Sequence, residues 1–149
     1  MDNLNEVLIK EIDLIQSCIN RMSQNSFIVK GCTISLVAVV LALLPESFDL
    51  TGLCIIGFVA TCCFWYLDAF FLKTEKLYRW KYDWVLANRL NCSEFCYNLD
   101  PNNSRMWLSD ENGNQKKAPC VFRIMFTKTL LPIYLPLLAL AIIVFKTQC

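Results

Sequence analysis

The chain has 149 residues, of which 56% are hydrophobic and 18% charged, and its formal net charge is +1. Soluble domains contain roughly 45–50% apolar and about 25% charged residues, so the apolar excess predicts contact with lipid or with a partner. A net charge this small provides no basic field for nucleic-acid binding, and we expect no direct contact with nucleic acid. These features predict an all-α integral membrane protein of one domain.

The first segment, residues 3–25, is polar enough to be soluble, and five of its apolar residues recur at spacings of 4, 3, 4 and 3 positions. This spacing predicts an amphipathic cytoplasmic helix over residues 1–26. Its apolar stripe consists of Leu8, Ile12, Ile15, Ile19 and Met22. The stripe could form a short coiled coil between subunits or pack on another cytoplasmic helix of the same chain. Binding flat on the membrane is a weaker alternative, because few cations flank the stripe.

Three apolar segments approach the roughly 17–25 residues that a transmembrane helix needs. They are Phe27 to Leu44, Leu50 to Leu72, and Leu130 to Phe145. We therefore expect a transmembrane hairpin over residues 27–72 and a third transmembrane helix with an external tail over residues 129–149. The third segment contains Pro132 and Pro136, so it can begin as a kinked or interfacial stretch.

The distribution of Lys and Arg predicts the orientation of these spans. The connector Pro45 to Asp49 has no cation, whereas ten cations lie from Lys73 to Lys128. The connector is then external and the region 73–128 cytoplasmic. This places the N-terminus inside and the C-terminus, with Lys146, outside the membrane, which is the bacterial inner membrane if the family resemblance described below holds.

The second span is expected to continue as a cytoplasmic helix through Leu90, because no glycine or proline interrupts it. Glu75 and Arg79 have the spacing of an intrahelical ion pair. The aromatic residues near this exit are Trp65, Tyr66, Tyr78, Trp80, Tyr82 and Trp84. They predict either a belt at the membrane interface or a packed cytoplasmic neck that includes Glu75, Arg79, Trp80 and Trp84. The positive-inside rule explains the cations from Lys73 to Lys81. The alternative is that these cations form a site for a nucleotide or an anionic lipid.

Residues 91–119 form a small cytoplasmic insertion rich in turn-forming residues. The Asn112-Gly113 pair favours a small hairpin with RMWL before it and APCVFRIMF after it. A segment of this size can fold only as a cap on the helices. It is therefore a candidate sensor or contact surface.

Two ionisable residues, Lys30 and Asp68, lie inside the predicted spans. Charges in the bilayer are costly and are usually paired or functional. In an antiparallel hairpin their depths match, which predicts an ion pair within or between subunits. The pair could fix the helix register or line an aqueous pathway as a gate, and Lys30 could instead extend to the headgroups.

No site for catalysis or for a cofactor is visible. Histidine is absent and there are only four glycines, so neither a histidine base nor a phosphate-binding loop is expected. The nine cysteines contain no CxxC pair, which predicts reduced thiols and neither a metal site nor a disulfide framework. We expect that the chain is not an enzyme.

Three stretches carry a family resemblance: RMSQNSFIVKG, WYLDAFFLKTEKLYRWKYD and FTKTLLPIYLPLLAL. With their layout, the chain resembles small bacterial multi-pass membrane proteins that act as effectors in anti-phage defence. The resemblance implies a homo-oligomer in the lipid bilayer that permeabilises or depolarises the inner membrane. A nucleotide signal or a cytoplasmic protein would be the trigger. The alternatives are a membrane adaptor that anchors a soluble partner protein, or a small channel or transport subunit.

Overall fold

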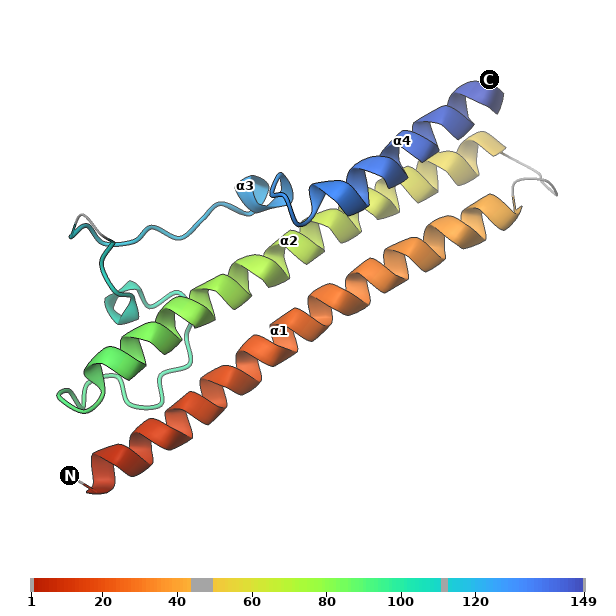
Figure 1. The fold of residues 1–149 in the computed structure, drawn as a ribbon. Coiled ribbons are helices and arrows are strands. Elements are labelled where there is room, and N and C mark those ends of the chain that lie inside the picture. Colours follow the sequence, from red (N-terminus) through yellow and green to blue (C-terminus); the bar gives the residue numbers. More distant parts are fainter. Residues whose placement is uncertain (1, 44–49, 111–112, 149) are drawn as a thin grey trace. The chain divides into compact units, whose positions relative to one another are not determined.

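The computed structural model describes residues 2–43, 50–110 and 113–148, and it contains helices but no strand in these ranges. The elements are α1 (Asp2–Leu43), α2 (Leu50–Asn88), the 3₁₀ helix η2 (Ser104–Met106), α3 (Val121–Met125) and α4 (Leu131–Gln148) (Figure 1). The all-α prediction is thereby confirmed for the described residues. The predicted external connector, Pro45 to Asp49, lies outside them.

Two helices are long and apolar enough to cross a membrane, over Leu4–Ala42 and Cys54–Asn88. Only 17% of the most apolar stretch of α1 and 28% of that of α2 are buried. The core helices of a soluble protein are mostly buried, so this exposure is compatible with a membrane protein. The apolar part of α4, Leu131–Ile143, is shorter.

The local sequence explains how far the helices extend. The second apolar segment continues without interruption to Asn88, close to the predicted end at Leu90. In α4, Pro132 lies in the first turn. Backbone N–H groups of the first turn have no acceptor within the helix, so the N–H that proline lacks costs no helical hydrogen bond. Pro136 lies inside α4, and apolar residues surround it along the sequence.

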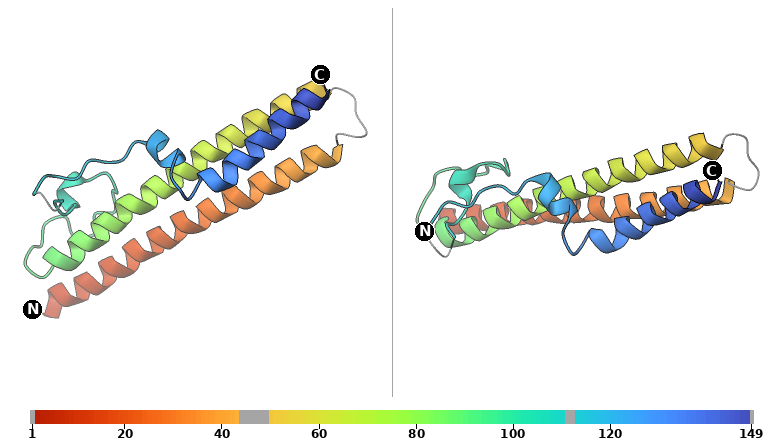
Figure 2. Two further views of the ribbon diagram at one scale, coloured as in Figure 1. Left: turned by 45° about the horizontal axis from the view of Figure 1, so that its top comes forward. Right: turned by 90° about the horizontal axis from the view of Figure 1, so that it is seen from above.

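The chain divides into two units, each described by itself. Unit 1 comprises Met1–Gln24 and Leu72–Pro119, and unit 2 comprises Asn25–Phe71 and Cys120–Cys149. The long helices α1 and α2 each contribute to both units (Figure 2). In unit 2, side chains of α1, α2 and α4 line one shared apolar space, so these three helices pack together.

The core of unit 1 is a cluster of buried side chains from α1, α2 and η2. Its members are Ile15, Cys18, Tyr78, Val85 and Met106. The other residues of the predicted stripe, Leu8, Ile12, Ile19 and Met22, pack against this cluster. Within the chain the stripe therefore contacts the part of α2 that belongs to unit 1, so it packs on another helix of the same chain.

The predicted hairpin does not form in the described residues, and Asn112 lies outside them. The stretch RMWL, residues 105–108, begins within η2, which the side chain of Asn103 caps by accepting a hydrogen bond from the Arg105 amide. The stretch APCVFRIMF, residues 118–126, contains the short helix α3 instead of a strand. The Asp110 amide donates to the Asn114 carbonyl at 2.9 Å, so only a turn is closed here.

Candidate functional site

Lys30 and Asp68, on α1 and α2, lie together in unit 2. The Lys30 Nζ atom is 2.9 Å from both carboxylate oxygens of Asp68. The Asp68 side chain is fully buried, whereas 21% of the Lys30 side chain is exposed. The structure therefore places this pair within one chain, between the two helices that are able to cross a membrane.

Two hydroxyl groups complete the site. Ser26, one turn before Lys30 on α1, donates to Asp68 Oδ1 and accepts from Lys30 Nζ at 2.6 Å. Tyr134 on α4 donates to Asp68 Oδ2 at 3.0 Å and is fully buried. The carboxylate thus accepts hydrogen bonds from both α1 and α4, so it joins three helices.

The aromatic residues of unit 2 hold Tyr134 in place. The Trp65 ring stacks on the Tyr134 ring at a centroid distance of 5.8 Å and an interplanar angle of 9°. The Trp65 indole N–H donates to the Met125 carbonyl at the end of α3, at 3.1 Å. Phe126 meets the same indole edge-on at 5.4 Å. The segment before α4 and the tyrosine hydroxyl are therefore fixed by one tryptophan of α2.

This arrangement stabilises a charge that is otherwise costly to bury. A carboxylate away from water needs a cation and further donors to offset its lost hydration. Asp68 has one ammonium and two hydroxyl donors, and no described buried side-chain nitrogen or oxygen lacks a hydrogen-bond partner. The site can hold the helices in register. If Lys30 and Asp68 separated, the carboxylate and the ammonium would be exposed to any water that entered.

A second buried ion pair lies in unit 1 and was missed by sequence reasoning. The Arg89 guanidinium binds both carboxylate oxygens of Glu11, with Nη2 at 3.1 Å from Oε1, and both side chains are almost fully buried. Glu11 also accepts from the Tyr97 amide at 2.6 Å. Arg89 donates further to the carbonyls of Cys92, Glu94 and Phe95. One pair therefore connects α1, α2 and the loop after α2.

Lys81 is the second buried cation of unit 1. Its ammonium donates to the Asp100 carbonyl at 2.8 Å and to the Asn98 side chain at 3.3 Å. Burial lowers the pKa of Lys81 from its usual 10.5 to about 8, although the charges of Asp100 and Glu11 act in the opposite direction. Lys81 therefore fixes the loop after α2 at Asn98 and Asp100, although burial disfavours its charged form.

The stability of unit 1 is expected to rise by roughly 1–2 kcal/mol between pH 8 and about pH 9.5. Folded Lys81 loses its proton near the lowered pKa of about 8, whereas the unfolded chain keeps it up to 10.5, so the folded state binds fewer protons in this range. Unfolding in detergent, followed by tryptophan fluorescence, measures the slope. Burial raises the pKa of Tyr78 above 10.0, which opposes the trend only at higher pH.

The Lys81→Met variant is the control for that experiment. It lacks the Lys81 ammonium, so its stability should rise less over this range than that of the wild type. Equal slopes in the two proteins would contradict the assignment to Lys81.

The predicted neck residues all lie in unit 1 on α2. Glu75 and Arg79 pair at 2.7 Å, with 62% of the Arg79 side chain exposed, so the pair contributes little to stability. Trp84 packs against the unit 1 core. Trp80 meets Trp107 edge-on at 5.4 Å. The aromatic residues of the neck are therefore packed within the unit.

The missed residues carry a signal in the sequence. Glu11 lies three positions after Leu8 and four before Ile15, so an acid lies on the apolar face of α1. Lys81 and Arg89 flank the buried Val85 at spacings of four. Charges on the apolar face of a helix predict buried pairing. The hydroxyl of Tyr134, within the third apolar segment, indicates a polar contact in the same way.

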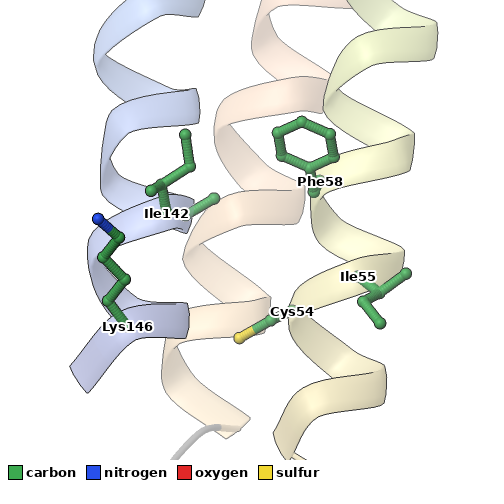
Figure 3. A pocket seen from close by; sticks show the side chains of 6 residues that line it. Cys54, Ile55, Phe58, Ile142 and Lys146 are labelled. Carbon is green, nitrogen blue, oxygen red and sulfur yellow. The ribbon is translucent and has the colours of Figure 1, made fainter. Parts of the chain in front are cut away.

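Unit 2 also has an apolar cavity of about 310 Å³ between α2 and α4. Cys54, Ile55 and Phe58 of α2 line it opposite Ile142 of α4, with the Lys146 amine at its edge (Figure 3). Fourteen residues separate Cys54 from Asp68, about 21 Å along a helix, so the cavity is distinct from the ion pair. Apart from the Cys54 thiol and the Lys146 amine, its lining side chains are hydrocarbon.

The described residues contain no group of three acidic or cysteine side chains placed to hold a metal ion. Their eight cysteines are free thiols. The polar side chains that bind one another around Asp68 are those of Ser26, Lys30, Asp68 itself and Tyr134.

Comparisons of the chain with protein-family models, with curated proteins and with solved structures find no match.

Proposed function

We propose that the chain is a non-enzymatic, oligomeric effector of a bacterial inner membrane, which depolarises or permeabilises that membrane in response to a cytoplasmic trigger. α1, α2 and the shorter α4 are the three spans of the proposal, with unit 1 in the cytoplasm. Phage infection is the proposed physiological context. The site at Lys30 and Asp68 is the proposed gate.

The buried Lys30–Asp68 pair is the observation that carries this proposal. Ionisable side chains within membrane segments are rare and mark ion pathways or paired gates. The Asp68 side chain is fully buried, and its hydrogen bonds come from two other helices. A trigger that separated α1 or α4 from α2 would have to break these bonds.

The proposed closed state is the one in which the network is intact. Its opening would leave a carboxylate and an ammonium unpaired in a medium of low dielectric constant, which water entry would then stabilise. Association of several copies would supply a water-filled passage that three helices alone are too few to enclose. The gate and the oligomer therefore have separate roles.

The test is the membrane potential of bacteria that express the full chain, measured with a voltage-sensitive dye. We expect the wild type to depolarise the cells on phage infection, whereas Asp68→Asn depolarises them without infection because the closed network is weakened. Lys30→Arg retains the cation and should behave as the wild type. Asp83→Asn, the same change at an exposed residue of α2, is the matched control.

A membrane adaptor is the second candidate function, and the geometry of unit 1 favours it. Arg89 binds the Phe95 carbonyl and Glu11 the Tyr97 amide in the loop after α2, where Phe95 and Tyr97 have left-handed backbone conformations, each with φ of 57°. Such conformations cost about 1 kcal/mol or more each and persist where the surroundings impose them. An unchanged potential in all variants and conditions, with a soluble protein retained at the membrane by unit 1, would establish the adaptor instead.

A further inference from the structure

Unit 1 has a polar cavity that neither the buried ion pair nor the proposed gate uses. Its volume is about 640 Å³, within the range of roughly 300–1,000 Å³ that is usual for small-molecule sites. The lining residues are Trp80, Asp110, Asn114, Gln115, Lys116 and Lys117. One comes from α2 and five from the segment after η2, so residues distant in the sequence meet here.

Trp80 is held in a defined position at this cavity. The Trp107 ring meets it edge-on at 5.4 Å with an interplanar angle of 70°. Trp107 is itself buried, and its indole N–H donates to the Pro101 carbonyl at 3.3 Å. Gln115 is anchored as well, because its amide donates to the Ser104 carbonyl at 3.1 Å. The wall of the cavity is thus built on packed residues.

Two ammonium groups lie over the ring of this tryptophan, and a third belongs to a residue that lines the same cavity. The Nζ atoms of Lys76 and Lys116 lie 5.5 Å and 5.4 Å from the centroid of the Trp80 ring, and Lys117 lines the cavity beside them. None of the three lysines forms a salt bridge with a described carboxylate. Positive-inside topology accounts for cations in this region, but not for their convergence on one indole ring.

We propose that this cavity binds a nucleoside phosphate. The ammonium groups of Lys76, Lys116 and Lys117 match the charge of phosphate groups, which lysine binds as a point charge. The side chains of Asp110, Asn114 and Gln115 offer the donors and acceptors that a base and a ribose require. The indole supplies an aromatic surface for the base once one of the ammonium groups over the ring moves to the phosphate.

A phospholipid headgroup shares the phosphate chemistry, but the position of the cavity favours a soluble ligand. Trp80 lies eight residues beyond Leu72, the predicted end of the second span, or about 12 Å along the helix. The headgroup layer extends only about 5–8 Å beyond the hydrocarbon on each side. The cavity therefore opens beyond the lipid phosphates in the proposed topology.

The role of this ligand as a trigger rests on the proposed function, whereas its binding does not. Calorimetric titration of the full chain, purified in detergent, separates the two questions because it measures binding without membrane potential. The probes are ATP, GTP, cyclic di-AMP and cyclic di-GMP, together with inorganic triphosphate and vesicles that contain phosphatidylglycerol. The variants are Lys116→Ala, Lys117→Ala and Trp80→Leu.

At least one nucleotide of this set should bind saturably, and each lysine variant should weaken it about tenfold or more. The Trp80→Leu variant should weaken the nucleotide more than it weakens inorganic triphosphate. Lys10→Ala removes a cation elsewhere in unit 1, from an exposed pair with Glu6, and should leave binding unchanged. This control distinguishes binding at the cavity from a general attraction of the nucleotide to the cations of unit 1.

Three results would overturn the proposal. One is that no nucleotide of the set binds. Another is that inorganic triphosphate binds as tightly as the nucleotides, which would indicate charge attraction alone. The third is that only the phosphatidylglycerol vesicles bind in a manner that depends on Lys116 and Lys117, which would assign the cavity to the lipid surface.

Discussion

Replacing Arg89 with methionine is expected to destabilise unit 1 by about 3–5 kcal/mol, because it leaves the buried carboxylate of Glu11 without its cation. The pair is almost fully buried, and the guanidinium also satisfies three loop carbonyls. Unfolding by denaturant in detergent, followed by tryptophan fluorescence, measures the loss. Far-ultraviolet circular dichroism of the same samples reports whether α1 and α2 remain helical.

Arg79→Met is the matched control for this change. It removes an arginine of the same helix, which pairs with Glu75 at the surface, and should cost no more than about 0.5 kcal/mol. Equal destabilisation of the two variants would indicate a general effect of losing charge on α2. That outcome would contradict the structural role of the Arg89–Glu11 pair.

A second variant tests whether the loop depends on the pair. Glu11→Leu combined with Arg89→Met removes both charges, and replacement of a buried pair by apolar residues is often neutral or stabilising. Here the double variant should recover less than half of the loss, since the loop carbonyls and the Tyr97 amide still lose their partners. Full recovery would show that only the charge balance matters.

The helices could largely be predicted from the sequence, because their signals are local. The stripe from Leu8 to Met22 predicts an amphipathic helix, and the absence of breakers from Lys73 to Leu90 predicts the extension of α2. The described residues form no strand on either side of the predicted hairpin, and the reason is again local. Asn103 caps a 3₁₀ turn where the first strand was expected, and α3 replaces the second.

A candidate site could be predicted in full only where both of its charged residues lie within the predicted apolar spans. Lys30 and Asp68 met this condition. Their matching depths in an antiparallel hairpin predict the ion pair that they form in the structure. Glu11 and Arg89 did not meet it, since neither lies in a predicted span; the apolar face of α1 indicates that Glu11 is buried, but not which residue it pairs with. Their pairing across 78 positions depends on how α1 packs on α2, which no local pattern specifies.

Loss of the Lys30 cation should destabilise unit 2 more than loss of the Asp68 charge. Lys30→Met leaves a fully buried carboxylate with only two hydroxyl donors, which should cost about 3–5 kcal/mol. Asp68→Asn leaves an ammonium that is 21% exposed and can extend toward the interface, so its cost should be about 1–3 kcal/mol.

The double variant Lys30→Met/Asp68→Asn decides how strongly the two residues are coupled. It contains no unpaired charge, and the asparagine that replaces Asp68 can accept from one of Ser26 and Tyr134 and donate to the other. It should therefore be more stable than Lys30→Met alone. A double-mutant cycle in lipid bicelles, with unfolding by sodium dodecyl sulfate, gives the coupling energy. Asp83→Asn, at an exposed position of α2, should change stability by less than about 0.5 kcal/mol.

The same cycle separates a gate from a simple structural contact. If the pair only fixes the helix register, depolarisation by the variants should follow their loss of stability, and Lys30→Met should be the most active. If the pair is the gate, the double variant should depolarise cells without a trigger although most of its stability is restored, because the electrostatic lock between α1 and α2 is absent in it. Additive stability losses together with an unchanged potential would exclude both roles, since they would show that Lys30 and Asp68 are uncoupled.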